Sequence, residues 1–147
     1  MSHSYVKNIL HVIFSTKERQ KTISQDFRAR FWAYIAGICH NHGIIAIEIG
    51  GIDDHVHMLV EIPATLSLSQ AMAPIKANSS RWTNEEGINF AWQEGYAAFS
   101  VSELDEPAVR RHIQSQEVHH KKVASEAEFI ELLNWHHVKF DPKYVLG

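Results

Sequence analysis

Residues 44–62 read IIAIEIGGIDDHVHMLVEI, and this stretch decides the fold. It holds two apolar runs, Ile44–Ile49 and Val56–Ile62, separated by a segment rich in glycine and aspartate. Such a pattern is typical of two antiparallel strands joined by a turn. Pro63 follows the second run directly, so the hairpin is predicted to end there.

A strand and a helix are predicted before this hairpin. Tyr5–Ser15 is rich in β-branched and aromatic residues, which is typical of a strand. Ser24 is a good N-cap for a helix, and Gly43 suits the position just after a helix end. Apolar residues recur at helical spacing between them: Phe27, Phe31, Tyr34, Ile35 and Ile38.

The chain after the hairpin completes the predicted fold. A helix is expected from Leu66 to about Trp82, with a kink or restart at Pro74. Short strands are expected at Phe90–Trp92 and Tyr96–Val101, and two helices at Glu106–Lys122 and Ser125–His137. The order β-α-β-β-α-β-α predicts an α+β fold, in which helices pack on a ferredoxin-like antiparallel sheet.

Composition narrows the class of protein. The 147 residues are 45% hydrophobic and 21% charged, which predicts one folded domain over residues 1–147 and excludes a disordered chain. The apolar runs are too short for a bilayer and no secretory signal is visible, so we expect a cytoplasmic protein with no membrane partner. The single cysteine, Cys39, excludes an internal disulfide and a thiolate-rich zinc site. A net charge of −3 argues against a phosphate-binding surface over the whole chain, but leaves local basic clusters.

The pair His55-Val56-His57 is the first candidate for chemistry in a chain with 11 histidines. On a strand these two histidines share a face, about 7 Å apart along the backbone, where both can bind one cation. The alternative is one satisfied, half-buried histidine and one exposed histidine. The glycine and aspartate turn before the pair and the apolar run Met58–Val60 after it favour a core strand and a functional site.

A polar stripe on the predicted late helix is the second candidate. His112, Gln116 and either His119 or His120 share one helix face. Such a stripe is typical of a solvated helix face, but Gln116 offers a neutral oxygen ligand for a hard divalent cation.

Four blocks of sequence, taken together, resemble one family. They are Gly51-x-Asp53-Asp54-His55-Val56-His57-Met58-Leu59-Val60, Lys76-x-x-Ser79-Ser80, Trp92-Gln93-x-Gly95-Tyr96-x-Ala98-Phe99-Ser100-Val101-Ser102 and Gln116-Glu117-x-His119-His120. The chain resembles the small HUH single-strand DNA transposases of the insertion-sequence 200 type and their relatives associated with repeated extragenic palindromes. The resemblance runs from the first predicted strand to the last helix.

The resemblance implies a specific chemistry. Family members are obligate homodimers that bind DNA hairpins and cut single-stranded DNA beside them. It implies that His55, His57 and Gln116 hold Mg²⁺ or Mn²⁺, which polarises the scissile phosphate. It also implies that a tyrosine one helical turn before the glutamine attacks, on a helix commonly donated by the partner subunit, to give a 5′-phosphotyrosine link and a free 3′-OH.

The sequence departs from this pattern at the nucleophile. The residue four positions before Gln116 is His112, not tyrosine. Histidine can attack a phosphoryl group, so His112 is kept as the candidate catalytic residue, but a stored phosphoramidate would be unusual for this family. We therefore expect a retained metal site with lost or altered strand-transfer activity.

Basic and aromatic side chains supply the remaining candidates. Four basic residues are candidate contacts to DNA phosphates, with ordinary surface charge as the alternative: Lys76, Arg81, Arg110 and Arg111. Trp32, Trp82 and Trp92 are expected to fill the core or a dimer interface, and Trp135 to close the last helix onto the sheet.

Three functions stay open at this point. The leading hypothesis is a dimeric, metal-dependent transposase acting on hairpin-bearing single-stranded DNA. The second is a non-catalytic DNA-binding regulator of the same fold. The third is a metal hydrolase unrelated to nucleic acid, with His55, His57 and a histidine of the late helix as ligands.

Overall fold

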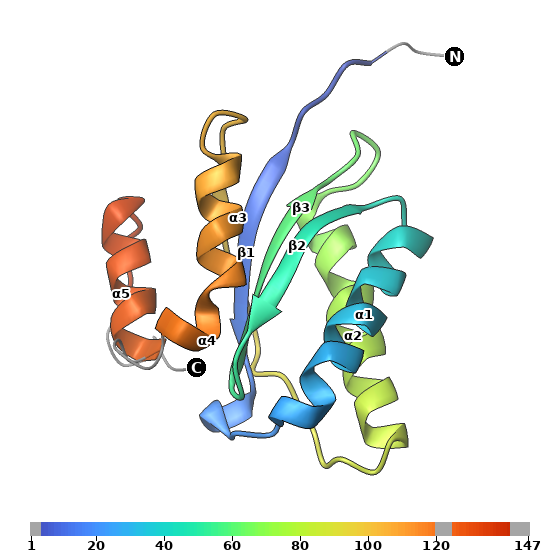
Figure 1. The fold of residues 1–147 in the computed structure, drawn as a ribbon. Helices are drawn as coiled ribbons and strands as arrows, with labels where there is room; N and C mark the ends of the chain where they lie inside the picture. Colours follow the sequence, from blue (N-terminus) through green and yellow to red (C-terminus); the bar gives the residue numbers. More distant parts are fainter. Residues whose placement is uncertain (1–3, 120–124, 142–147) are drawn as a thin grey trace.

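A four-stranded antiparallel sheet forms the centre of the chain (Figure 1). A computed structural model describes residues 4–119 and 125–141. The strands are β1 (Ile9–Ser15), β2 (Ile45–Gly51), β3 (His55–Glu61) and β4 (Ala97–Ser100), in the order β2-β3-β1-β4. All neighbouring strands run antiparallel. This order is that of a ferredoxin-like sheet, so the predicted α+β class is confirmed.

Helices cover both faces of the sheet (Figure 1). On one face lie α1 (Gln25–Asn41) and α2 (Leu68–Glu85), and a short 3₁₀ turn, η1 (Lys17–Arg19), leads from β1 towards α1. On the other face lie the late helices, α3 (Glu106–Gln114), α4 (Gln116–His119) and α5 (Ser125–Trp135). Among the described residues, no helix combines the length and the apolarity that crossing a membrane requires.

The face under α1 and α2 holds the main apolar core. Alternate strand residues point into it, such as Val12 and Phe14 of β1 and Met58 of β3. The predicted apolar stripe of α1 is buried here, with Phe31 and Ile35 both fully enclosed. Three tryptophans pack against this core, as predicted: Trp32, Trp82 and Trp92.

The face under α3, α4 and α5 holds two smaller apolar clusters with a polar group between them. Ile113 of α3 packs on Leu59 of β3 in one cluster, and Leu133 of α5 packs on Ile13 of β1 in the other. Gly50 lets α3 approach the sheet, because a Cβ atom at this position would lie 2.7 Å from the backbone oxygen of Ile113. The interior of this face is therefore apolar only in part.

Two predicted strands differ from the structure. The first strand begins at Ile9, not at Tyr5. Phe90–Trp92 forms no strand, and Trp92 makes only a single bridge to Thr16. The physical reason lies in Asn84, whose side-chain amide takes up both the backbone N–H and the backbone C=O of Phe90.

The predicted helices also differ in their bounds. α2 continues through Pro74 without a restart. The helix predicted over Glu106–Lys122 is broken at Ser115, whose hydroxyl donates to the backbone oxygen of His112 at 3.1 Å and competes with the helical pattern. Residues 120–122 of that prediction lie outside the described residues. The last helix ends at Trp135, before the predicted His137.

The prediction for Trp135 is wrong. This side chain is 80% exposed and does not close α5 onto the sheet. Phe129 and Leu133 do so instead, because they are four residues apart on the inward face of the helix. Trp135 follows Leu133 by two positions, which turns it to the outer side.

Candidate functional site

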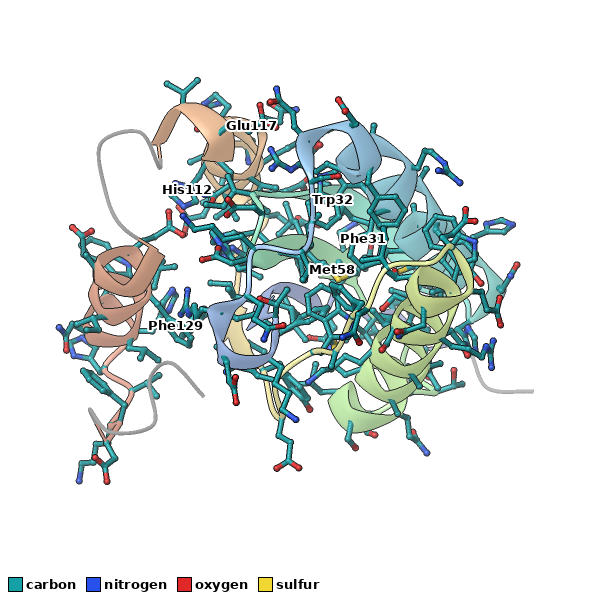
Figure 2. All side chains as sticks on the ribbon, turned by 90° about the horizontal axis from the view of Figure 1, so that it is seen from below. Phe31, Trp32, Met58, His112, Glu117 and Phe129 are labelled. Carbon is teal, nitrogen blue, oxygen red and sulfur yellow. The ribbon has the colours of Figure 1, made fainter. Side chains whose placement is uncertain are left out.

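A group of polar side chains is buried between the sheet and the late helices. It combines three strand histidines with a glutamine and a glutamate from the helices: His11, His55, His57, Gln116 and Glu128. Figure 2, seen from below, shows His112 and Phe129 on this side of the sheet, with Phe31 and Trp32 on the opposite side. Because burying polar groups costs free energy unless they are paired, this group requires either mutual hydrogen bonds or a bound ligand.

Acceptor atoms face one another at the centre of the group. Nε2 of His57 lies 2.8 Å from Oε1 of Glu128, and Nε2 of His55 lies 3.1 Å from Oε1 of Gln116. A lone-pair nitrogen and a carboxylate or amide oxygen do not attract each other, so a proton or a cation has to lie between them. One ligand atom from each of His55, His57 and Glu128 lies within 4.8 Å of the other two. This spacing fits a single divalent cation.

The outer nitrogens of both central histidines have partners. Nδ1 of His55 lies 2.8 Å from a carboxylate oxygen of Asp54, and Nδ1 of His57 lies 2.8 Å from Nε2 of His11. Metal-binding histidines usually use their second ring nitrogen in this way, which fixes the tautomer and the direction of the other lone pair. Here both Nε2 atoms are turned inward, toward Glu128 and Gln116.

Burial also keeps two of the histidines neutral. Desolvation is the main cause that lowers the pKa of His57 to about 4 and the pKa of His11 to about 2. The neutral imidazole is the form that binds a metal ion. His57 is thus in its binding form at neutral pH, and neutral His11 can accept the Nδ1–H of His57. The donor set therefore fits a divalent cation.

His112 lies at the rim of this group. Its Nε2 is 3.1 Å from Nε2 of Gln116 and 3.5 Å from Oε2 of Glu128. Its side chain is 32% exposed, whereas His57 is fully buried. The break at Ser115 does not separate His112 from Gln116. The side chain of His119 and the whole of His120 lie outside what the structure describes.

Glu128 is one of two residues in this group that the sequence motifs missed, the other being His11. Glu128 lies on α5, outside every motif, twelve residues beyond Gln116. One available signal is its position on the helix, because Glu128 precedes Leu132 by four residues and so shares a face with an apolar side chain that packs inward. A glutamate is almost never fully buried unless it is paired, so its place within such a stripe points to a bound partner.

The four predicted basic residues do not form one surface. Lys76 donates from Nζ to the backbone oxygens of Gln93 and Gly95, and partial burial lowers its pKa. Arg81 lies near Glu85 on the same helix, α2, across the sheet from the buried polar group.

The other two basic residues lie on α3, on the side of the polar group. Arg110 pairs with Glu48 of β2 at 3.0 Å, and Arg111 is exposed. Contacts to DNA from these four residues stay a prediction.

Comparison with known proteins gives a family match over most of the chain. A family model described as "Transposase IS200 like" matches residues 4–116. The transposases for insertion sequence element IS200 of Salmonella typhimurium and Salmonella typhi are each 29% identical over 76 residues, which is 52% of this chain and 50% of theirs. The chain thus spans about half the length of these curated relatives.

Two solved structures share the fold. A candidate transposase of Deinococcus radiodurans superposes with a TM-score of 0.61 and 19% identity, covering 79% of this chain and 96% of that one. A REP-associated tyrosine transposase bound to a REP hairpin superposes with a TM-score of 0.63 and 15% identity, covering 84% and 74%. With the family match over most of its length, the chain belongs to the IS200-like transposase family.

Proposed function

We propose that this chain binds hairpin-bearing single-stranded DNA as a homodimer and holds a divalent cation between His55, His57 and Glu128, with Gln116 beside them. The observation that carries the proposal is the set of inward-facing acceptor atoms, whose spacing suits one shared cation. A relative of the same fold was solved bound to a REP hairpin, which supports a DNA hairpin as the ligand of this chain.

The donor set favours Mn²⁺ over Mg²⁺. Two of the three donors are imidazole nitrogens, and Mg²⁺ prefers an octahedral shell of oxygen atoms, whereas Mn²⁺ accepts nitrogen more readily. When bound, the cation supplies Lewis acidity to a phosphate oxygen of the DNA. Glu128 brings the negative charge that imidazole ligands lack, and Asp54 and His11 keep both imidazoles turned inward.

His112 determines the chemistry that is possible once DNA is bound. In the reaction that the family resemblance implies, a tyrosine oxygen forms a bond to phosphorus while the bond from phosphorus to the 3′ oxygen breaks, and that oxygen leaves as a hydroxyl. His112 places an imidazole at the rim instead of a phenol. We infer that the wild-type chain binds the DNA but forms no stable covalent link.

A non-catalytic DNA-binding regulator is the second candidate. The same observation, His112 at the nucleophile position, favours it. The two candidates differ in one respect: a latent transposase site becomes active when its nucleophile is supplied, whereas a regulator's site does not.

One experiment separates these candidates. A labelled hairpin oligonucleotide with single-stranded flanks is incubated with Mn²⁺ and either the wild type, His112→Tyr or His112→Phe, the last as a control of similar size without a hydroxyl. We expect an acid-stable protein–DNA adduct and a nicked strand with His112→Tyr alone, because the geometry and the Lewis acid are already in place.

Two results contradict this expectation. An adduct with the wild type that is lost in acid and survives alkali would make His112 the nucleophile. DNA binding by all three proteins with no adduct would favour the regulator. The homodimer is tested separately by sedimentation at micromolar concentration, where a clean monomer would contradict it.

A further inference from the structure

Trp135 is largely exposed, so folding buries little of its aromatic ring. All four tryptophans are described; three pack against the main core, and Trp135 alone is 80% exposed. It is the last residue of α5, the helix that also brings Glu128 to the buried polar group. Large exposed aromatic surface of this kind often marks a binding site.

A groove runs from Trp135 to the polar group. Two adjoining cavities, of about 320 Å³ and about 280 Å³, share His112, Leu132 and Trp135 as lining residues. The larger one reaches His11, and the smaller one reaches Glu128. We call this feature the α3–α5 groove. It joins the exposed tryptophan to the proposed metal site.

The lining of the groove suits an uncharged, flat group. Its walls are apolar at Val101, Val109 and Leu132, and its polar groups are mainly histidines and carboxylates. Within the described part of the chain, neither cavity is lined by a lysine or an arginine. A phosphate would meet acidic neighbours here, such as Glu131, whereas a nucleobase carries no charge and presents a face for stacking.

We propose that the α3–α5 groove receives an unpaired base of the single-stranded flank, stacked on Trp135, next to the phosphate held at the metal site. This inference rests on the proposed function, because it needs DNA at the site. A phosphate held by the proposed cation near Glu128 and His112 places the adjoining nucleosides in the groove that opens from these residues. Stacking on an aromatic ring tolerates any base, so Trp135 adds affinity rather than sequence preference.

The test compares two DNA ligands and four proteins. Fluorescence anisotropy, with Mn²⁺ present, measures the affinity for a hairpin with single-stranded flanks and for the same hairpin without them. The proteins are the wild type, Trp135→Leu, Trp135→Phe and Tyr5→Leu, a control at another aromatic residue that is 95% exposed. We expect Trp135→Leu to lose about 5- to 100-fold in affinity for the flanked hairpin alone. Trp135→Phe should keep most of it, and Tyr5→Leu should match the wild type.

The other outcomes overturn either this inference or the proposed function. Equal affinity of the wild type and Trp135→Leu for the flanked hairpin overturns the inference and leaves the proposed function intact. An equal loss on both DNA ligands, or dissociation of a dimer by Trp135→Leu in sedimentation, also overturns it, because Trp135 would then contact duplex DNA or the partner subunit. No hairpin binding by the wild type defeats the proposed function itself.

Discussion

The two faces of the sheet enclose different interiors. Under α1 and α2, aromatic and aliphatic side chains pack in one continuous core around Phe31. Under α3, α4 and α5, two small apolar clusters flank three buried histidines, Gln116 and Glu128. The first face therefore has the apolar interior of an ordinary domain core, whereas the second buries less apolar surface and encloses polar side chains.

One face thus contributes mainly to stability, and the other holds the candidate site. Apolar burial stabilises by about 25 cal/mol for each Å² removed from water, so the α1 and α2 face, with the largest apolar cluster, supplies most of the hydrophobic stabilisation. Buried polar groups cost free energy unless they are paired, so the late-helix face depends on Asp54, His11 and the proposed cation to complete its contacts. Mutations on the α1 and α2 face should therefore change mainly the stability, whereas mutations on the late-helix face should also change metal binding.

The largest effect is expected at Phe31. Replacing this fully buried ring with alanine should lower the free energy of unfolding by roughly 3–5 kcal/mol, because it leaves a cavity in the main core. Urea unfolding measures this loss. Phe129→Ala, at a partly buried ring of α5, should cost less. Equal losses at the two positions would contradict the division between the faces.

Lowering the pH should destabilise the protein through the buried histidines of the late-helix face. Burial lowers the pKa of His57 to about 4 and of His11 to about 2, so the unfolded chain takes up protons near pH 6.5 and the folded chain does not. The stability of the metal-free protein should then fall between about pH 7.5 and pH 5, by at most about 2 kcal/mol for each histidine. Urea unfolding at both pH values checks this.

A variant makes the pH measurement specific. His11→Leu removes one of the two groups, so its stability should fall less over the same pH interval. A decline as steep as that of the wild type would contradict the assignment to His11.

Replacing His11 is expected to have a smaller effect, a loss of metal affinity. His11→Leu removes the acceptor for Nδ1–H of His57 and should weaken Mn²⁺ binding about 10- to 100-fold in titration calorimetry. His11→Gln places an amide oxygen in reach and should restore part of the affinity, which a purely structural role for His11 would not predict. Equal binding by the wild type and His11→Leu would remove His11 from the site.

Local patterns predicted most of the fold. The residues of the β2–β3 hairpin and the apolar stripe of α1 have a clear period, and both elements formed close to their predicted bounds. The strand predicted at Phe90–Trp92 did not form, because the side chain of Asn84 takes up the backbone hydrogen bonds of Phe90. The sequence of neither segment alone reveals this contact. The break at Ser115 was missed for a similar reason, since a serine interrupts some helices and not others.

The part of the candidate site that lies on a single strand was predictable from the sequence. The spacing of His55 and His57 is a strand pattern, and the structure places both on one buried face. Glu128 and His11 reach the pair only through tertiary packing of α5 and β1, which no spacing in the sequence encodes. The roles of His55, His57 and Gln116 as metal ligands stay predictions.

Metal titration tests the central claim most directly. Metal-free wild type, His57→Ala, Glu128→Gln and the control His40→Ala, at an exposed histidine of α1, are titrated with Mn²⁺ in a calorimeter. We predict one ion per chain for the wild type and for His40→Ala, weaker binding for Glu128→Gln, and none for His57→Ala. Mn²⁺ binding by His57→Ala equal to that of the wild type, or no binding by the wild type, would contradict a metal site on the late-helix face.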